Sequence, residues 1–363
     1  MASPTKSFSV PATLAGERVD RAISLVLDMP RAKVSSLVAA GKVMVDGIPP
    51  SQRSKLLVEG QVVEVTVGEY VPDVAIADST VAFKVVYADE WIAVIDKPAG
   101  LVVHHGAAHA SGTLVDGLLA KFPGLGQLAA MGAMDAARPG IVHRLDRETS
   151  GLMVVGLTPQ AFSTLSAAMA ARQVERHYTA LVSGTVPEAR GSVDAPVGRM
   201  PGNPTSMGVT VTGRHAVTHY TVQARFARPV ETSLLDVRLE TGRTHQIRVH
   251  MSSISHPVIG DTRYKGPSWK SLGLGGGLIA EAREGVTVIG EGVDGAGPGD
   301  GAVDGDPPAP LGEGRIFLHA CRLSLEHPVT GRHMEWQSPL PSELVSVLQR
   351  LESACNPAGN CHA

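Results

Sequence analysis

Hydrophobic and polar positions divide the chain into two parts with different predicted structures. Within residues 16–68, two stretches place apolar residues at helical spacing, and the segments KVMVDG and QVVEVTV that follow alternate between apolar and polar residues. After a polar linker at 69–82, the segment FKVVYADEWIAVIDKPAGLVVH alternates again and is interrupted by the turn KPAG. The pattern predicts a small domain at 16–68 and a larger one at 83–350, with tails at 1–15 and 351–363.

The larger domain combines many predicted strands with few helices. Strand-like segments are HYTALVSG, HYTVQARF, SLLDVRLETG and HMEWQSPL, and helical segments are TLVDGLLAKF, AFSTLSAAMAARQV and PSELVSVLQRLES. Strands and helices do not alternate regularly, as they would in a parallel α/β protein. We therefore expect an α+β fold built on a mixed, mainly antiparallel sheet.

The pattern is lost between about residues 268 and 313, where glycine, proline and acidic residues dominate. Eight acids and one base lie between Glu281 and Gly314, so this segment carries a formal charge of −7. Because the whole chain carries −3, the remainder carries +4 and can bind phosphate groups through local patches. We expect a disordered insertion. Its acidity could also imitate RNA and cover a basic cleft, although acidic linkers are usually only solvated.

The overall composition is that of a folded protein, with 43% hydrophobic and 18% charged residues. The N-terminal segment MASPTKSFSV lacks the features of a secretion signal, and no stretch approaches about 18 consecutive apolar residues. Three cysteines are too few for a disulfide framework, and a cytoplasmic location is expected. The tail residues Cys355, Cys361 and His362 lack a fourth ligand, so no metal is expected.

Basic residues accumulate in the small domain. The stretch from 31 to 55 holds one acid, Asp46, against five bases, which are Arg31, Lys33, Lys42, Arg53 and Lys55. Such a group can face RNA phosphates, although surface charge alone is common. The succession RVDRAISLVL, PRAKVSSLVAAGKVMVDG and LLVEGQVVEV resembles the S4 RNA-binding domain over nearly its whole length. The resemblance implies that residues 16–68 bind RNA.

The segment IVHRLDRETSGLMVVGLT, residues 141–158, places Asp146 in a polar turn directly before an apolar strand. Loops at the ends of rigid strands often present catalytic groups. Taken alone, an aspartate between Arg144 and Arg147 is more often part of a structural ion pair.

Further motifs resolve this ambiguity. HRLDRETSGLMVV resembles the catalytic motif of the RluA family of pseudouridine synthases, and DKPAGLVVH, VERHYTALVSG, LETGRTHQIRVHM, HPVIGDTRYKG and FLHACRLSLEHPVTG occur in the order of that family. The likeness covers residues 83–348 apart from the insertion. Together with the S4-like domain, the layout is similar to the ribosomal large-subunit pseudouridine synthase D branch. It implies isomerisation of uridine in large-subunit ribosomal RNA, with transfer RNA as the second candidate.

The resemblance also implies roles for single residues. Asp146 corresponds to the carboxylate that acts covalently, Arg248 to its charged partner, and Tyr178 to the tyrosine that stacks on uracil and assists proton removal. Arg144 is expected to fill the space left by the extruded nucleotide, and Arg243 to contact phosphate. The reaction is redox-neutral and requires no cofactor, and the chain has neither a G-x-x-x-x-G-K-[ST] nor an H-E-x-x-H motif.

Three histidines near these motifs, His143, His245 and His250, are as readily structural as RNA-binding, and we do not assign them to catalysis. Two other function classes remain. A non-catalytic RNA-binding assembly factor is disfavoured because Asp146, Tyr178 and Arg248 are intact. An aspartic hydrolase is disfavoured because the D-[ST]-G signature is absent. A monomer is expected.

Overall fold

The computed structural model describes residues 5–355 except 28, 30–33, 35–36, 39, 51, 53–54, 67–74, 106–110, 201–202, 274–310 and 312–313. Contacts divide the chain into two units, Met1–Val74 and Ala75–Ala363. Each unit is described by itself below.

The N-terminal unit contains a three-stranded antiparallel sheet in the order β1-β3-β2. Its elements are β1 (Thr5–Ser9), η1 (Ala12–Leu14), α1 (Val19–Val26), β2 (Val43–Val45) and β3 (Val62–Thr66). Alternation in β3 buries Val63 and Val65 against Val19 and Ile23 of α1, as the period-two pattern predicts.

The predicted N-terminal tail at residues 1–15 was wrong from Thr5 onward. Residues Thr5–Ser9 pair with β3 along its full length, and Val10 is buried. Five residues, alternating weakly and mostly polar, leave too little signal to predict this edge strand. Much of the second predicted helix lies outside the described residues, although Val34 and Leu37 are buried in the core of this unit.

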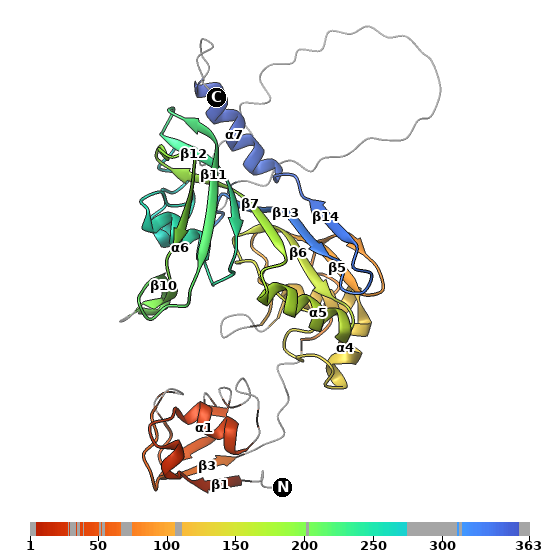
Figure 1. The fold of residues 1–363 in the computed structure, drawn as a ribbon, viewed down its shortest axis with the longest axis vertical. Coiled ribbons are helices and arrows are strands. Elements are labelled where there is room, and N and C mark those ends of the chain that lie inside the picture. Colours follow the sequence, from red (N-terminus) through yellow and green to blue (C-terminus); the bar gives the residue numbers. More distant parts are fainter. Residues whose placement is uncertain are drawn as a thin grey trace. The chain divides into compact units, whose positions relative to one another are not determined.

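The larger unit is built on a nine-stranded sheet in the order β4-β5-β6-β13-β7-β12-β11-β8, with β14 paired to β13 (Figure 1). The strands are β4 (Lys84–Ala88), β5 (Ile92–Lys97), β6 (Ser150–Gly156), β7 (Glu175–Ser183), β8 (Arg190–Asp194), β11 (Val217–Phe226), β12 (Thr232–Leu239), β13 (Leu318–Glu326) and β14 (His333–Gln337). A separate two-stranded sheet joins β9 (Val197–Met200) and β10 (Asn203–Val209). Among the described strands, only β6 and β13 are parallel, so the predicted mixed, mainly antiparallel α+β fold is confirmed.

Helices cover this sheet on both faces. They are α3 (Leu114–Lys121), α4 (Pro123–Ala130), α5 (Pro159–Ala170), α6 (Gln246–Ser253) and α7 (Ser342–Cys355), with the 3-10 helix η2 (Thr262–Tyr264). In β5, Ala93 and Ile95 join the core beneath α3, whereas Ile92 and Val94 join the core beneath α5. Helices α3, α5 and α7 match the predicted segments, but α4 and α6 were not predicted. No helix in the described part of the chain is both long and apolar enough to cross a bilayer.

Two predicted boundaries of the larger domain were wrong. Ala75 lies in the main core of this unit, so the predicted linker at 69–82 extends too far. Trp269 and Leu272 are buried with Phe317, so residues 268–273 belong to the fold and the insertion cannot begin before Gly273. Because the surrounding sequence is rich in glycine, its pattern did not indicate that Trp269 and Leu272 are buried. Most of the predicted insertion lies outside the described residues.

One glycine is required where the segment that follows Asp146 enters the sheet. Gly151 has φ +114°, and a Cβ there would collide with the backbone of Ala320. Because β6 and β13 are neighbouring strands at this point, only glycine leaves room for the backbone of Ala320.

Candidate active site

Asp146 lies in the turn that precedes β6, and the preceding KPAG turn holds that loop in place. The carbonyl oxygen of Arg147 accepts hydrogen bonds from Gly100 N at 2.7 Å and from Lys97 Nζ at 3.2 Å. Lys97 is fully buried and also donates to the carbonyls of Pro98 at 2.8 Å and Leu101 at 2.9 Å. Two motifs about 50 residues apart in sequence thus form one rigid support for Asp146.

Arg248 is the cation beside Asp146. Its Nη1 donates to Asp146 Oδ2 at 3.4 Å and to Glu148 Oε2 at 3.2 Å. Its Nε and Nη2 donate to the two carboxylate oxygens of Asp261 at 2.6 and 2.9 Å. Burial opposes the charged form, but hydrogen bonding and charge from Asp261 prevail and raise the pKa of Arg248. The guanidinium is therefore permanently charged, and Asp261 fixes its direction.

His245 and Tyr264 complete the surroundings of this pair. His245 has a left-handed backbone, φ 56°, at the start of α6, and its Nδ1 lies 2.6 Å from the Tyr264 hydroxyl. Its Nε2 lies 3.9 Å from Asp146 Oδ1. The Tyr264 ring lies 5.1 Å from the Arg248 guanidinium. Burial lowers the pKa of His245, although Asp146 acts in the opposite direction.

Tyr178 projects from β7 into the same small pocket as Asp146 and Arg248, a cavity of about 50 Å³. Its side chain is buried in the main core, where Leu239 and Leu318 also line the pocket. Burial raises the pKa of Tyr178 to about 12, so the phenol is protonated at neutral pH. The pocket therefore offers a carboxylate, a fixed cation and a neutral aromatic hydroxyl.

A larger groove of about 670 Å³ adjoins this pocket and shares Arg144, Arg176, Gly242 and Arg243 with it. Six arginines line it, and we call it the arginine groove: Arg138, Arg144, Arg172, Arg176, Arg214 and Arg243. The acidic residue in its lining is Glu240, which pairs with Arg172 at 2.9 Å. The groove is thus a strongly positive surface that leads to Asp146.

The residues singled out from the sequence fall into three groups. Asp146, Tyr178, Arg248, Arg144 and Arg243 meet at the small pocket or the arginine groove. In the N-terminal unit, Lys42 is exposed and Lys55 is partly exposed. Arg31, Lys33 and Arg53 lie outside the described residues.

Two of the three histidines that sequence reasoning set aside are held by structural contacts. His143 Nε2 accepts a hydrogen bond from Val154 N at 3.0 Å. His250 is buried, with Nδ1 at 2.8 Å from Thr218 Oγ1 and Nε2 at 2.9 Å from the Ala195 carbonyl. His245, by contrast, faces Asp146.

Sequence reasoning missed three contributors to the site: Glu148, Asp261 and Tyr264. Asp261 and Tyr264 stand in the quoted segment HPVIGDTRYKG, and Glu148 in the motif of Asp146 itself. No local pattern indicates that these side chains meet Arg248.

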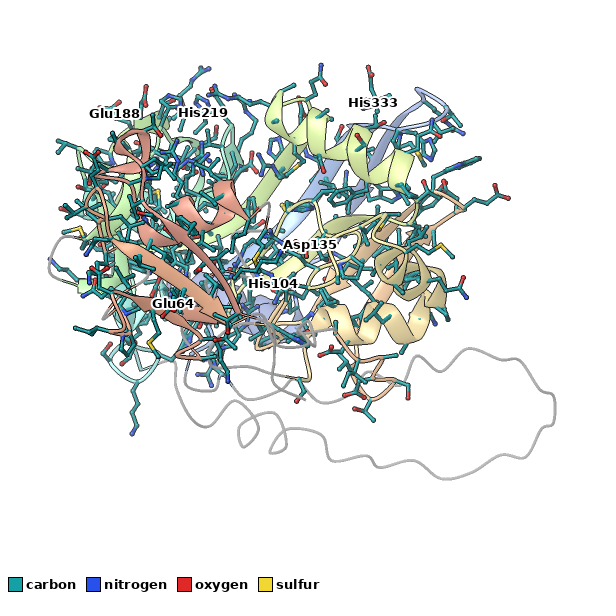
Figure 2. The ribbon with its side chains drawn as sticks, turned by 90° about the horizontal axis from the view of Figure 1, so that it is seen from below. Glu64, His104, Asp135, Glu188, His219 and His333 are labelled. Atoms are coloured by element: carbon teal, nitrogen blue, oxygen red, sulfur yellow. The ribbon has the colours of Figure 1, made fainter. Side chains whose placement is uncertain are left out.

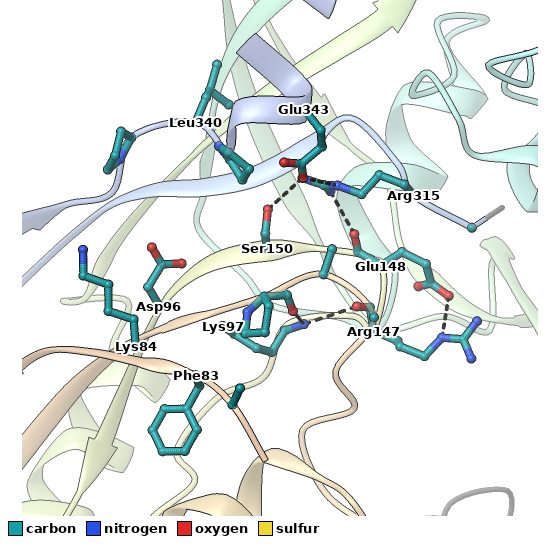
Figure 3. Close-up of a pocket in the computed structure, with 17 residues that line it drawn as sticks. Phe83, Lys84, Asp96, Lys97, Arg147, Glu148, Ser150, Arg315, Leu340 and Glu343 are labelled. Atoms are coloured by element: carbon teal, nitrogen blue, oxygen red, sulfur yellow. Dashed lines mark hydrogen bonds and ion pairs between the residues drawn. The ribbon is translucent and has the colours of Figure 1, made fainter. Parts of the chain in front are cut away.

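A second cavity, of about 960 Å³, is lined by Lys97, Arg147, Glu148 and other residues but not by Asp146 (Figure 3). In its lining, Arg315 is already engaged, since it donates to Glu343 at 3.1 Å and to Ser150 Oγ at 3.0 Å. Although it is larger, it lacks the convergent reactive groups of the small pocket. Within the described residues, no group of three or more His, Cys, Asp or Glu side chains is arranged to hold a metal ion.

Comparisons with known proteins identify proteins that are similar to this chain. A family model described as RNA pseudouridylate synthase matches residues 92–253, a range that contains Asp146, Tyr178 and Arg248. An "Uncharacterized RNA pseudouridine synthase" of Chloroflexus aurantiacus is 40% identical over 344 residues, covering 94% of this chain and 92% of that protein. "Ribosomal large subunit pseudouridine synthase D" of Pseudomonas aeruginosa is 37% identical over 353 residues, covering 95% of each. The solved structure "Human RNA Pseudouridylate Synthase Domain Containing 4" is 26% identical, with a TM-score of 0.48, over 74% of this chain and 93% of that one.

Proposed function

Because this chain belongs to the RNA pseudouridylate synthase family, we propose that it converts uridines of large-subunit ribosomal RNA to pseudouridine, with Asp146 as the covalent carboxylate. The choice of RNA is supported by relatives that are 34–37% identical over nearly the whole chain and carry the name "Ribosomal large subunit pseudouridine synthase D".

One observation carries the proposal for the site: Asp146, oriented by Arg248, lies where a small pocket meets the arginine groove. An extruded base can reach Asp146 where the groove opens onto the pocket, and the groove can hold the phosphates on either side of that base. A carboxylate placed at such a junction meets the ribose and the base together.

The reaction itself needs no external group. The bond from the ribose anomeric carbon to nitrogen 1 of uracil breaks, the base rotates, and a bond to carbon 5 forms. The carbon-5 proton leaves and nitrogen 1 ends with a proton, so atoms and electrons balance without an oxidant or a donor. Asp146 adds covalently to the base or to the anomeric carbon and is released afterwards, which divides one difficult step into two. Arg248 keeps the carboxylate oriented and stabilises its charged form.

Tyr178 stacks on the uracil ring and assists removal of the carbon-5 proton. With a pKa of about 12, its phenol is protonated at neutral pH and is a poor base by itself. Its hydroxyl can therefore accept the carbon-5 proton only while passing its own proton to a second acceptor. The ring contributes aromatic contact in either case.

RNA contacts are divided between the two units in this proposal. In the larger unit, Arg144 fills the space of the extruded nucleotide, and Arg243 and the rest of the arginine groove bind phosphates. In the N-terminal unit, an S4-like domain, Lys42 and Lys55 extend the phosphate contacts, as do Arg31, Lys33 and Arg53 outside the described residues. We further propose a monomeric enzyme that works in the cytoplasm without a cofactor or metal.

Tritium release tests the chemistry and the choice of RNA together. Unmodified large-subunit ribosomal RNA and unmodified transfer RNA, each labelled with tritium at carbon 5 of uridine, are incubated with the full chain. The proposal expects release from ribosomal RNA well above that from transfer RNA. Release from transfer RNA alone would make transfer RNA the substrate in place of ribosomal RNA. RNA binding without any tritium release would favour a non-catalytic assembly factor.

A further inference from the structure

We propose that His104 is a positioning residue for this reaction, because its ring holds the Arg144 guanidinium in place in the arginine groove before RNA binds. The inference rests on the proposed role of Arg144 in nucleotide extrusion. It extends that role to a residue that ends the motif DKPAGLVVH without an assigned role and does not line the pocket around Asp146.

The two side chains meet on the wall of the groove. Arg144 Nη1 donates to His104 Nε2 at 3.3 Å, and both residues line the same cavity. An arginine can only donate hydrogen bonds, so Nε2 must be the unprotonated nitrogen and Nδ1 must carry the proton. The contact therefore exists only while His104 is neutral.

The surroundings of His104 keep it neutral. Burial, followed by the charges of Arg144 and Arg138, lowers the pKa of His104 to about 4, with a further lowering contribution from His105. Asp135, which is labelled with His104 in Figure 2, acts in the opposite direction and is itself paired with Arg138 at 2.9 Å. At neutral pH the ring is thus a permanent acceptor for Arg144.

Its neutral partner distinguishes Arg144 from two other arginines of the groove, Arg138 and Arg172. Arg138 pairs with Asp135 and Arg172 pairs with Glu240, each at 2.9 Å, so a carboxylate partly cancels their charge. Among the described residues, no carboxylate forms an ion pair with Arg144. A neutral imidazole directs the guanidinium without cancelling its charge, and Arg144 stays fully attractive to phosphate and to base faces.

Holding Arg144 in advance has a kinetic benefit. Arginine has many rotamers, and a side chain already restrained loses less entropy when it must enter a base stack. The buried Nδ1 of His104 has no hydrogen-bond partner among the described residues. Because an unpartnered buried N–H costs stability, the position is not optimised for folding alone.

Three substitutions of His104 separate the possible reasons for its presence. His104→Phe keeps a ring but removes the acceptor, His104→Gln keeps an acceptor oxygen, and His104→Asp replaces the neutral acceptor by a charge. Each is measured for affinity to large-subunit ribosomal RNA and for single-turnover tritium release from the carbon-5-labelled RNA with enzyme in excess. The matched control is His333→Phe, an exposed histidine on β14 that is also labelled in Figure 2.

We expect His104→Phe to slow single-turnover release by about tenfold, the effect of one charge-assisted hydrogen bond, while RNA affinity changes less than twofold. His104→Gln recovers most of the rate. His104→Asp also slows release and in addition weakens RNA binding, because the new carboxylate cancels the charge of Arg144. His333→Phe behaves as wild type.

A double-mutant cycle with Arg144→Ala distinguishes failure of this inference from failure of the proposed function. If His104 acts through Arg144, His104→Phe causes no further loss in the Arg144→Ala background. Equal losses in both backgrounds, or a normal rate for His104→Phe beside a slow Arg144→Ala, would overturn the inference. A normal rate for Arg144→Ala would instead remove the proposed role of Arg144 itself.

Discussion

Asp261 binds the Arg248 guanidinium through both carboxylate oxygens, at 2.6 and 2.9 Å, and leaves only Nη1 to face Asp146. Asp146, the proposed covalent carboxylate, is thus oriented by an arginine that is itself held by a second carboxylate, 13 residues further along the chain. This arrangement makes Asp261 as important for the geometry of the site as Arg248.

The first prediction concerns the two hydrogen bonds that Arg248 donates to Asp261. Asp261→Asn keeps the shape of the side chain but removes its charge, so Arg248 is no longer fixed and Nη1 moves away from Asp146. We expect tritium release to fall by about 10- to 100-fold and the free energy of unfolding to fall by about 2 kcal/mol, the loss of a buried charged hydrogen bond.

Tritium release and urea unfolding measure these two effects. The matched control is Glu335→Gln, which removes a carboxylate from an exposed pair with Arg322 at 4.0 Å and should change stability by less than about 0.5 kcal/mol. Tritium release by Asp261→Asn at the wild-type rate would show that Arg248 does not need Asp261 to orient it.

The second prediction separates the ring of Tyr178 from its hydroxyl. Tyr178→Phe retains aromatic contact with the base and loses the proton relay, so RNA affinity stays within about twofold while single-turnover release falls by about 100-fold. Tyr178→Leu lacks both the ring and the hydroxyl, so both RNA affinity and the rate of release should fall. Filter binding and tritium release distinguish the two, and an unchanged rate in Tyr178→Phe would exclude the hydroxyl from proton transfer.

The third prediction concerns salt dependence. Arg243→Gln removes one cation from the arginine groove, so RNA affinity falls and the slope of log affinity against log salt concentration becomes shallower by about one. Arg322→Gln, in a residue that does not line the groove, is the control. Binding titrations between low and physiological salt measure both slopes, and equal slopes for Arg243→Gln and wild type would argue against a phosphate contact.

A fourth prediction follows from the partly buried His143. Burial lowers the pKa of His143 from 6.5 to about 3, and its Nε2 must stay unprotonated to accept from Val154 N. Between pH 3 and 6.5 the unfolded chain binds a proton at this residue that the folded chain does not, so stability falls as the pH is lowered through this range. The slope from one such histidine approaches about 1.4 kcal/mol per pH unit.

His143→Gln should therefore lose stability less steeply than wild type between pH 6.5 and 4.5, as measured by urea unfolding at a series of pH values. His104, whose pKa is also lowered, contributes in the same direction in both proteins. Parallel pH profiles for the two proteins would mean that His143 is not held neutral.

Local patterns in the sequence were sufficient for most strands of the large sheet and for α3, α5 and α7, because period-two and helical spacing survive wherever one face of an element is buried. They failed at α6, whose eight residues bury Gln246, Arg248 and His250 and so show no apolar face. In this helix, polar side chains are buried because they hold one another and the site.

The candidate site, like the fold, was predicted only in part from the sequence. A resemblance of motifs was sufficient to select Asp146, Tyr178 and Arg248, which line one pocket. It could not select Asp261 or His104, because their importance arises only when distant segments meet. The contact between Arg144 and His104 spans 40 residues, and no spacing rule in a sequence describes such a pair.

The most direct test of the central claim is tritium release from carbon-5-labelled large-subunit ribosomal RNA by Asp146→Asn, with wild type and Glu335→Gln measured beside it. The amide is nearly the same size as the carboxylate, so folding and RNA affinity should be retained. We predict that release by Asp146→Asn is abolished while wild type and Glu335→Gln release tritium equally. Release by Asp146→Asn at the wild-type rate would contradict the assignment of Asp146 as the covalent carboxylate.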